Sequence, residues 1–113
     1  MVINCSEPLD HDGYPTEEAL GLIENYDMIT NDYTFVPLIE FIREIWHWDS
    51  YFKLTGKRVL KLQLHTGGWS GNEEIVAALM KTPIFWSLCW VKSERGGHYY
   101  FEIVPIKRNQ KET

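Results

Sequence analysis

The sequence is poor in cysteine, has no long hydrophobic run and carries almost no basic residues in its first half. Its two cysteines, Cys5 and Cys89, lie far apart, which excludes a disulfide-dense miniprotein and predicts reduced thiols in a cytosolic setting. The longest apolar runs span three or four residues, whereas a membrane-spanning helix needs about 20. The first residues hold neither a basic stretch nor an apolar one, so we expect no signal peptide and a cytoplasmic location.

Several catalytic motifs are also missing. The glycine-rich segment 67–71 lacks both the lysine of a P-loop and the G-x-G-x-x-G spacing of a dinucleotide-binding fold. Ser70 does not lie in a G-x-S-x-G nucleophile elbow, and the apolar neighbours of Cys89 predict a buried, inert thiol. No two histidines are two or four positions apart. We therefore expect no metal site and no cofactor, and a non-enzymatic role is favoured.

What the chain does contain is typical of one globular domain. Its 113 residues are 44% hydrophobic and 24% charged, which matches the size and composition of a single folded unit. We expect one domain over residues 1–113, with an irregular segment at 1–14 and a frayed polar tail at 107–113.

Two helices are predicted in the first half. Residues 17–26 follow Thr16, which is suited to accept a hydrogen bond from the first helical turn as an N-cap. Residues 35–48 repeat apolar side chains at three- and four-residue spacing, the pattern of a helix with one buried face. We interpret Trp46 and Trp48 in this second helix as packing residues.

The second half predicts three strands and one further helix. Residues 58–65 alternate apolar and polar side chains, while residues 84–91 and 98–106 are rich in aromatic and β-branched residues. Residues 92–97 suit a hairpin loop between the last two strands. The predicted fold class is α+β in the order ααβαββ, with a small three-stranded sheet, mixed or antiparallel. Two or three helices would pack mainly on one face of this sheet.

The glycine-rich connection 66–71 is the most site-like feature. Ser70 and Glu73 have the spacing of a capping box at the start of a helix over 71–81. The connection is either a tight turn with a helix cap or a loop that binds a ligand or peptide. Seven candidate binding residues lie on it and on the polar side of the adjacent strands: His65, Trp69, Ser70, Asn72, Glu73, His98 and Tyr100.

Two questions about this loop stay open at the sequence level. Trp69, flanked by glycine and serine, is either a plug over the core or an exposed contact residue of the kind enriched at interfaces. If His65, Glu73, His98 and Tyr100 converged around a pocket, they would favour a small-ligand or enzyme site.

Charge divides the chain into two halves. Residues 1–50 carry eleven carboxylates and one base, Arg43, whereas residues 51–113 carry ten bases and five carboxylates. The halves either neutralise each other within the chain or present faces to partners of opposite charge. A nucleic acid partner is not expected, because the net charge is −5 and the bases are scattered. The candidate acidic face comprises Glu17, Glu18, Glu24, Asp27, Glu40 and Glu44.

Two stretches resemble small proteins of bacteriophages and prophages that have no established activity. The first is His65–Ile75, and the second is Arg95–Ile103. The resemblance covers residues 58–104 at most, and it implies a cytoplasmic accessory role in bacteria. Small acidic phage proteins often bind a host protein, so it favours an interaction protein and assigns no catalytic residues.

The leading hypothesis from the sequence is a small acidic interaction or inhibitor protein of phage or prophage origin. Its acidic helical half and the Trp69 loop would contact a partner protein. The alternatives are the small-ligand or enzyme site at residues 65–74 and an immunity or antitoxin protein. Five tryptophans in so short a chain also leave room for an apolar homodimer face.

Overall fold

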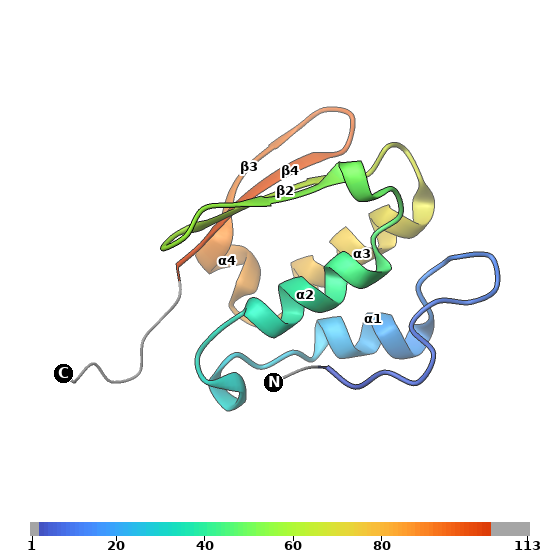
Figure 1. Cartoon of the computed structure of the whole chain (residues 1–113), viewed down its shortest axis with the longest axis horizontal. Coiled ribbons are helices and arrows are strands. Elements are labelled where there is room, and N and C mark those ends of the chain that lie inside the picture. Colours follow the sequence, from blue (N-terminus) through green and yellow to red (C-terminus); the bar gives the residue numbers. More distant parts are fainter. Residues whose placement is uncertain (1–2, 105–113) are drawn as a thin grey trace.

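The structure, a computed structural model, describes residues 3–104 as an α+β fold in which helices cover one face of a sheet (Figure 1). The sheet has four antiparallel strands in the order β1-β2-β4-β3. The strands are β1 (Phe52–Thr55), β2 (Leu60–His65), β3 (Trp90–Glu94) and β4 (His98–Ile103).

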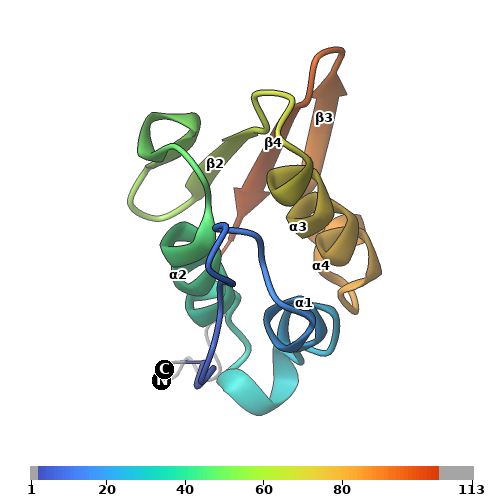
Figure 2. The same cartoon turned by 90° about the vertical axis from the view of Figure 1, so that its right-hand side faces the viewer.

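The helices form layers beneath the sheet. Helices α2 (Val36–Ile45) and α3 (Ser70–Lys81) lie side by side under it, with the short α4 (Phe85–Cys89) beside α3 (Figure 2). Helix α1 (Glu17–Glu24) packs against α3 on the side away from the sheet. Two single turns of 3₁₀ helix, η1 (Ile29–Asn31) and η2 (Asp49–Tyr51), complete the described elements.

The hydrophobic core lies between the sheet and the helices. Leu62 and Leu64 of β2 and Phe101 and Ile103 of β4 point into it, as the alternation in residues 58–65 predicts for β2. The largest buried side chains that meet them from the helices are Ile23, Leu38, Ile39, Ile42, Ile45, Ile75, Leu79 and Phe85. The opposite face of the sheet carries no helix among residues 3–104, so its side chains face solvent.

The prediction of three strands was wrong by one, because β1 was missed. This strand has only four residues, Phe52–Thr55, which is too short for alternation to be distinguished from chance. It is held by pairing with β2, in a register that places Phe52 opposite Leu64 and Leu54 opposite Leu62. Its strand character therefore comes from the partner strand.

The prediction of a strand over residues 84–91 was also wrong. Residues Phe85–Cys89 form α4, and β3 begins at Trp90. Phe85 and Cys89 are both buried and four residues apart, the spacing that places two side chains on one face of a helix. In a strand the same two side chains would also share one face, together with Ser87, so their spacing alone does not distinguish a strand from a helix.

Element ends differ from the predictions at several places. Strand β2 begins at Leu60 and not at residue 58, and β4 ends at Ile103. Helix α1 ends at Glu24, two residues earlier than predicted, while Thr16 is its N-cap as predicted and accepts a hydrogen bond from the Ala19 N–H at 3.1 Å. The predicted tail at 107–113 lies outside the described residues.

The predicted capping box at α3 is wrong. Ser70 is the first residue of the helix, Trp69 is its N-cap, and no side chain accepts a capping hydrogen bond there. The Ser70 hydroxyl instead donates to the Tyr14 hydroxyl oxygen at 3.1 Å. No helix among residues 3–104 is both long and apolar enough to cross a membrane.

Candidate functional site

Two glycine-containing loops meet at the end of the sheet where β2 finishes and β4 begins. The Thr66 N–H donates to the Gly97 carbonyl oxygen at 2.9 Å, and Thr66 is fully buried. Gly97 has a φ of 84°, and a Cβ atom there would collide with the Thr66 hydroxyl. Only glycine fits this contact, because it tolerates positive φ and has no side chain. The contact fixes the position of the loop that leads into α3.

Asn72 connects α3 to the segment that follows α2. Its Oδ1 accepts from the His47 N–H at 2.9 Å, and its Nδ2 donates to the His47 carbonyl oxygen at 3.1 Å. The Asn72 side chain is fully buried and also reaches the Thr66 carbonyl oxygen, at 3.4 Å. Helix α2 consequently ends at Ile45, three residues before the predicted end at Trp48.

Five aromatic rings line up across this end of the molecule, and we call them the aromatic ridge: Tyr14, Trp69, His47, Trp48 and Tyr51. Successive ring centroids in that order are 4.6, 4.3, 4.6 and 5.4 Å apart. The Trp69 and His47 rings are stacked, with 23° between their planes. Trp48 is 45% exposed and Tyr51 is 39% exposed. The ridge therefore offers aromatic surface to solvent.

The conformation of Trp48 is unusual. It has a φ of 68°, a region that a bulky residue adopts only when its surroundings impose it. Gly67 lies directly against it, and a Cβ atom at Gly67 would be 2.5 Å from Cζ3 of Trp48 and 2.8 Å from Cε2 of Tyr51. Trp46 is buried as predicted, whereas Trp48 packs against Gly67 and Tyr51 with 45% of its surface still exposed.

A polar cluster occupies the solvent-facing side of the sheet, which we call the outer sheet face. His65 and His98 are opposite each other in the β2–β4 register, and their Nδ1 atoms form a hydrogen bond of 2.7 Å. The Gln63 Oε1 lies 3.2 Å from His65 Nε2. Partial burial, and then the neighbouring His98 and Lys53, lower the pKa of His65 below its usual value.

A second group on this face joins β3 to β4. Glu94 accepts hydrogen bonds from Lys92 Nζ and from the Tyr100 hydroxyl, both at 3.1 Å. These hydrogen bonds lower the pKa of Glu94. Partial burial and the adjacent Glu94 raise the pKa of Tyr100. The ammonium of Lys92 lies 4.8 Å from the centroid of the Tyr100 ring, a cation–π contact.

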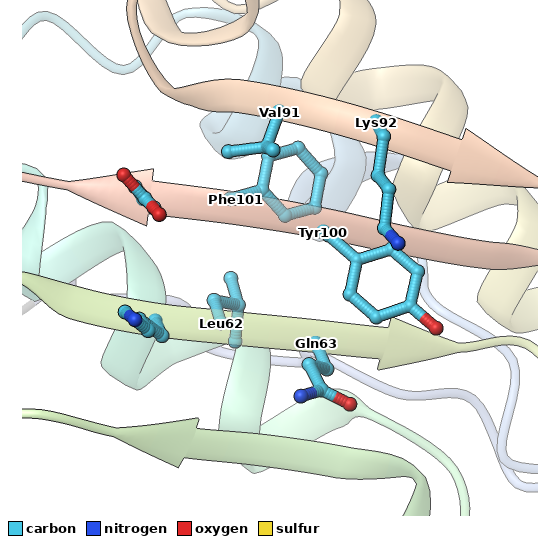
Figure 3. Close-up of a pocket in the computed structure, with 8 residues that line it drawn as sticks. Leu62, Gln63, Val91, Lys92, Tyr100 and Phe101 are labelled. Atoms are coloured by element: carbon cyan, nitrogen blue, oxygen red, sulfur yellow. The ribbon is translucent and has the colours of Figure 1, made fainter.

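Beside this group the outer sheet face is hollowed. The hollow has a volume of about 170 Å³. Figure 3 shows the Tyr100 ring lying over the strands between Lys92 and Gln63, with Val91 beside Lys92 at the edge strand. Lys61 and Glu102, which are opposite each other in the β2–β4 register, also line the hollow.

The predicted binding residues divide between the aromatic ridge and the outer sheet face. His65, His98 and Tyr100 meet on the outer sheet face, where the His65 and Tyr100 rings are 6.0 Å apart. Trp69 is half-buried within the aromatic ridge, where it is both packed and partly exposed. Glu73 is exposed in the first turn of α3 and makes no side-chain hydrogen bond or ion pair with a residue of the 3–104 range. Ser70 and Asn72 support the ridge through Tyr14 and His47.

Half of the candidate acidic face has local structural roles. Glu18 accepts hydrogen bonds from the N–H groups of Ser6 and Glu7, which lower the pKa of its carboxyl group. Asp27 accepts from the Ile29 N–H at 2.9 Å, and Glu24 is 3.9 Å from Lys81.

Three carboxylates of the candidate acidic face have no such role. Glu17, Glu40 and Glu44 are exposed, without an ion-pair partner within the described part of the chain.

Charge is separated between the layers. The sheet and its connecting turns, residues 52–65 and 90–104, carry six bases and two carboxylates. The helices that carry Glu17, Glu40 and Glu44 lie on the other side of the core (Figure 1). Within residues 3–104, the ion pair that links the two halves of the sequence is Glu24–Lys81.

Sequence reasoning missed four members of the ridge as site residues: Tyr14, His47, Trp48 and Tyr51. One signal was present, since the segment 46–51 holds two tryptophans, a histidine and a tyrosine within six positions. The helical pattern assigned most of that segment to a packed face. Its departure from helix depends on Asn72, which is 25 residues away from His47.

Neither the aromatic ridge nor the outer sheet face groups the side chains that bind a metal ion. Within residues 3–104 no group of three or more histidine, cysteine, aspartate or glutamate side chains is placed to hold a metal ion. Comparisons with protein-family models, with curated proteins and with solved structures returned no match.

Proposed function

We propose that this chain is a non-enzymatic interaction protein that binds a partner protein through the aromatic ridge. The observation that carries the proposal is Trp48, an indole that is 45% exposed and held at a φ of 68°. Nearly half of this large apolar side chain stays exposed on strained backbone, and such strain gathers at functional positions. Asn72 and Gly67 hold the segment in this conformation from the other side of the loop.

The composition of the ridge is that of an interface centre. Tryptophan and tyrosine are enriched among the few residues that supply most of the binding energy at protein interfaces. Each ring already contacts the next, with Trp69 and His47 stacked and the other pairs tilted, so little side-chain freedom is lost when a partner binds. The ridge therefore supports binding without a large rearrangement.

Charge indicates which kind of partner fits. Each of the three segments that supply the ridge also carries an exposed carboxylate, namely Asp12, Asp49 and Glu73. These three segments, residues 12–14, 47–51 and 69–73, contain no lysine or arginine. A basic surface on the partner would therefore be steered toward the ridge. The resemblance to phage proteins favours a bacterial protein as this partner.

The test compares capture of proteins from a bacterial lysate by four purified forms of the chain. These are the wild type, Trp48→Ala, Tyr51→Ala and the matched control Leu88→Ala. Leu88 is 53% exposed on α4, so its substitution removes a similar apolar surface away from the ridge. Circular dichroism and melting curves verify that all four forms are folded.

We expect one protein to be captured by the wild type and by Leu88→Ala, and to be lost with both ridge variants. With that protein purified, Trp48→Ala should weaken the Kd by about thirtyfold or more, the effect of truncating an interface hot spot. Equal capture by all four folded forms would place binding elsewhere. Absence of any protein specific to the wild type and Leu88→Ala would contradict the proposal.

A further inference from the structure

The hollow on the outer sheet face belongs to neither the aromatic ridge nor the function proposed for it. We propose that this hollow binds one nucleotide whose base carries an exocyclic amine, with its phosphate held by lysines. The nucleotide is either free or one residue of a single-stranded nucleic acid. The proposal combines the size of the hollow, the chemistry of its lining and the charge of the layer in which it lies.

The size and floor of the hollow suit one planar ring. Its volume of about 170 Å³ is below the range of about 300–1,000 Å³ for pockets that hold drug-sized ligands. Val91 supplies an apolar surface, and the Tyr100 ring lies flat along the face beside it (Figure 3). Aromatic side chains on open sheet faces are the surfaces on which single-stranded bases stack.

The rim offers both donors and acceptors, which the edge of a base requires. Lys61 and Glu102 are opposite each other across β2 and β4. Neither of them forms an ion pair with another residue of the described chain, so both remain available to a ligand. Glu102 can accept from an exocyclic amine, as acidic side chains do from cytosine. Gln63 presents an amide Nε2 that can donate, while its Oε1 lies 3.2 Å from His65 Nε2.

Lysine ammonium groups at the hollow would bind the phosphate of the proposed nucleotide. Lys61 and Lys92 both line the hollow; Lys61 has no ion-pair partner among the described residues, whereas Lys92 is paired with Glu94 at 3.1 Å and would share its charge between that carboxylate and the phosphate. The surrounding sheet layer carries six bases against two carboxylates. Because the acidic helices lie on the far side of the core (Figure 1), the net negative charge of the chain does not determine the potential at this face. An anionic ligand is therefore favoured here although the whole protein is acidic.

The test uses NMR titrations of the full chain with CMP, UMP and inorganic phosphate. We expect CMP to shift the amide resonances of Gln63, Val91 and Tyr100, with a Kd in the range of about 1 mM because the hollow is small. UMP should bind more weakly, since uracil has a carbonyl where cytosine has the amine that Glu102 accepts from. Inorganic phosphate alone should shift these resonances much less than CMP.

Three variants assign the effect to the hollow. Lys61→Gln should weaken CMP binding by about tenfold, the effect of losing one charge-assisted contact. Glu102→Gln should reduce the preference for CMP over UMP. The matched control is Lys57→Gln, an exposed lysine in the β1–β2 turn that does not line the hollow, and it should leave Kd within about twofold of the wild type.

Titration with a single-stranded oligodeoxycytidine distinguishes a free nucleotide from a nucleotide within a single-stranded nucleic acid. Much tighter binding than CMP indicates a single-stranded nucleic acid, and comparable binding per site indicates a free nucleotide. The proposal is overturned if neither CMP nor the oligonucleotide shifts the resonances at Gln63, Val91 and Tyr100. It is also overturned if phosphate alone reproduces the shifts, or if Lys57→Gln weakens binding as much as Lys61→Gln.

Discussion

Asn72 hydrogen-bonds both backbone groups of His47, accepting from its N–H at 2.9 Å and donating to its carbonyl oxygen at 3.1 Å. A fully buried side chain on α3 thereby satisfies the two backbone groups of a residue just after α2, where helical hydrogen bonding has ceased. The amide of asparagine carries a donor and an acceptor, which is what this position needs. The relationship places His47 and Trp48 in the aromatic ridge.

Replacing Asn72 by alanine should destabilise the protein by about 2–4 kcal/mol, because it leaves two backbone groups unpaired and opens a small buried space. Urea unfolding monitored by tryptophan fluorescence measures this change. The control is Asn4→Ala, at an exposed position with no side-chain hydrogen bond to another described residue, which should change stability by less than about 0.5 kcal/mol. Equal effects of the two substitutions would contradict the structural role of Asn72.

Gly97 and Gly68 form a matched pair that separates backbone strain from steric contact. Both have positive φ, 84° and 76°, but a Cβ atom at Gly97 would collide with Thr66 whereas Gly68 has open space. We expect Gly68→Ala to cost about 1–2 kcal/mol from the left-handed conformation alone. Gly97→Ala should destabilise the protein by at least about 1 kcal/mol more than Gly68→Ala, because the added methyl group overpacks the contact with Thr66. Chemical unfolding of both variants decides this, and an equal loss would refute the close contact with Thr66.

The histidine pair predicts a pH dependence of stability. Burial lowers the pKa of His65 below 6.5 in the folded state, so the unfolded chain binds more protons as the pH falls through that value. The free energy of unfolding therefore decreases as the pH is lowered below the unfolded pKa of histidine. Above that pKa the pair has no destabilising effect. The 2.7 Å hydrogen bond between the two Nδ1 atoms adds a reason, since both nitrogens cannot carry protons at that distance.

Unfolding free energies measured between about pH 7.5 and pH 5 test this dependence. His65→Gln should flatten the decline, whereas His11→Gln should not, because the His11 side chain is 93% exposed. Glu18 and Glu94, whose carboxyl pKa values are lowered in the folded state, contribute stability that is lost mainly as the pH falls below their unfolded value of about 4.5, which lies below this window. The same slope in the wild type and in His65→Gln would show that the pair is not responsible.

Thr16 and Ser70 should differ in their contribution to helix stability. Thr16 caps α1 through a hydrogen bond from the Ala19 N–H, so Thr16→Ala should cost about 1 kcal/mol. Ser70 caps nothing, and its exposed hydrogen bond to Tyr14 predicts a loss of less than about 0.5 kcal/mol for Ser70→Ala. Melting temperatures of the two variants provide the comparison. A larger loss for Ser70→Ala would restore the capping-box interpretation.

Local patterns in the sequence were sufficient for part of the structure. The alternation of Leu60, Leu62 and Leu64 predicted β2 and its buried face, and the N-cap at Thr16 marked the start of α1. The buried face of α2 also followed from its apolar spacing. These features depend on residues within one element, where periodicity and capping act over three to eight positions.

The sequence by itself thus determined the α+β class, the separation of charge along the chain and the presence of polar side chains on one sheet face. The tertiary structure decided the rest. It made a strand of Phe52–Thr55 by pairing it with β2, and it ended α2 early through Asn72. It also brought Tyr14, His47, Trp48 and Trp69 into one ridge. These outcomes depend on partners tens of residues away, and a local pattern carries no information about which distant groups will meet.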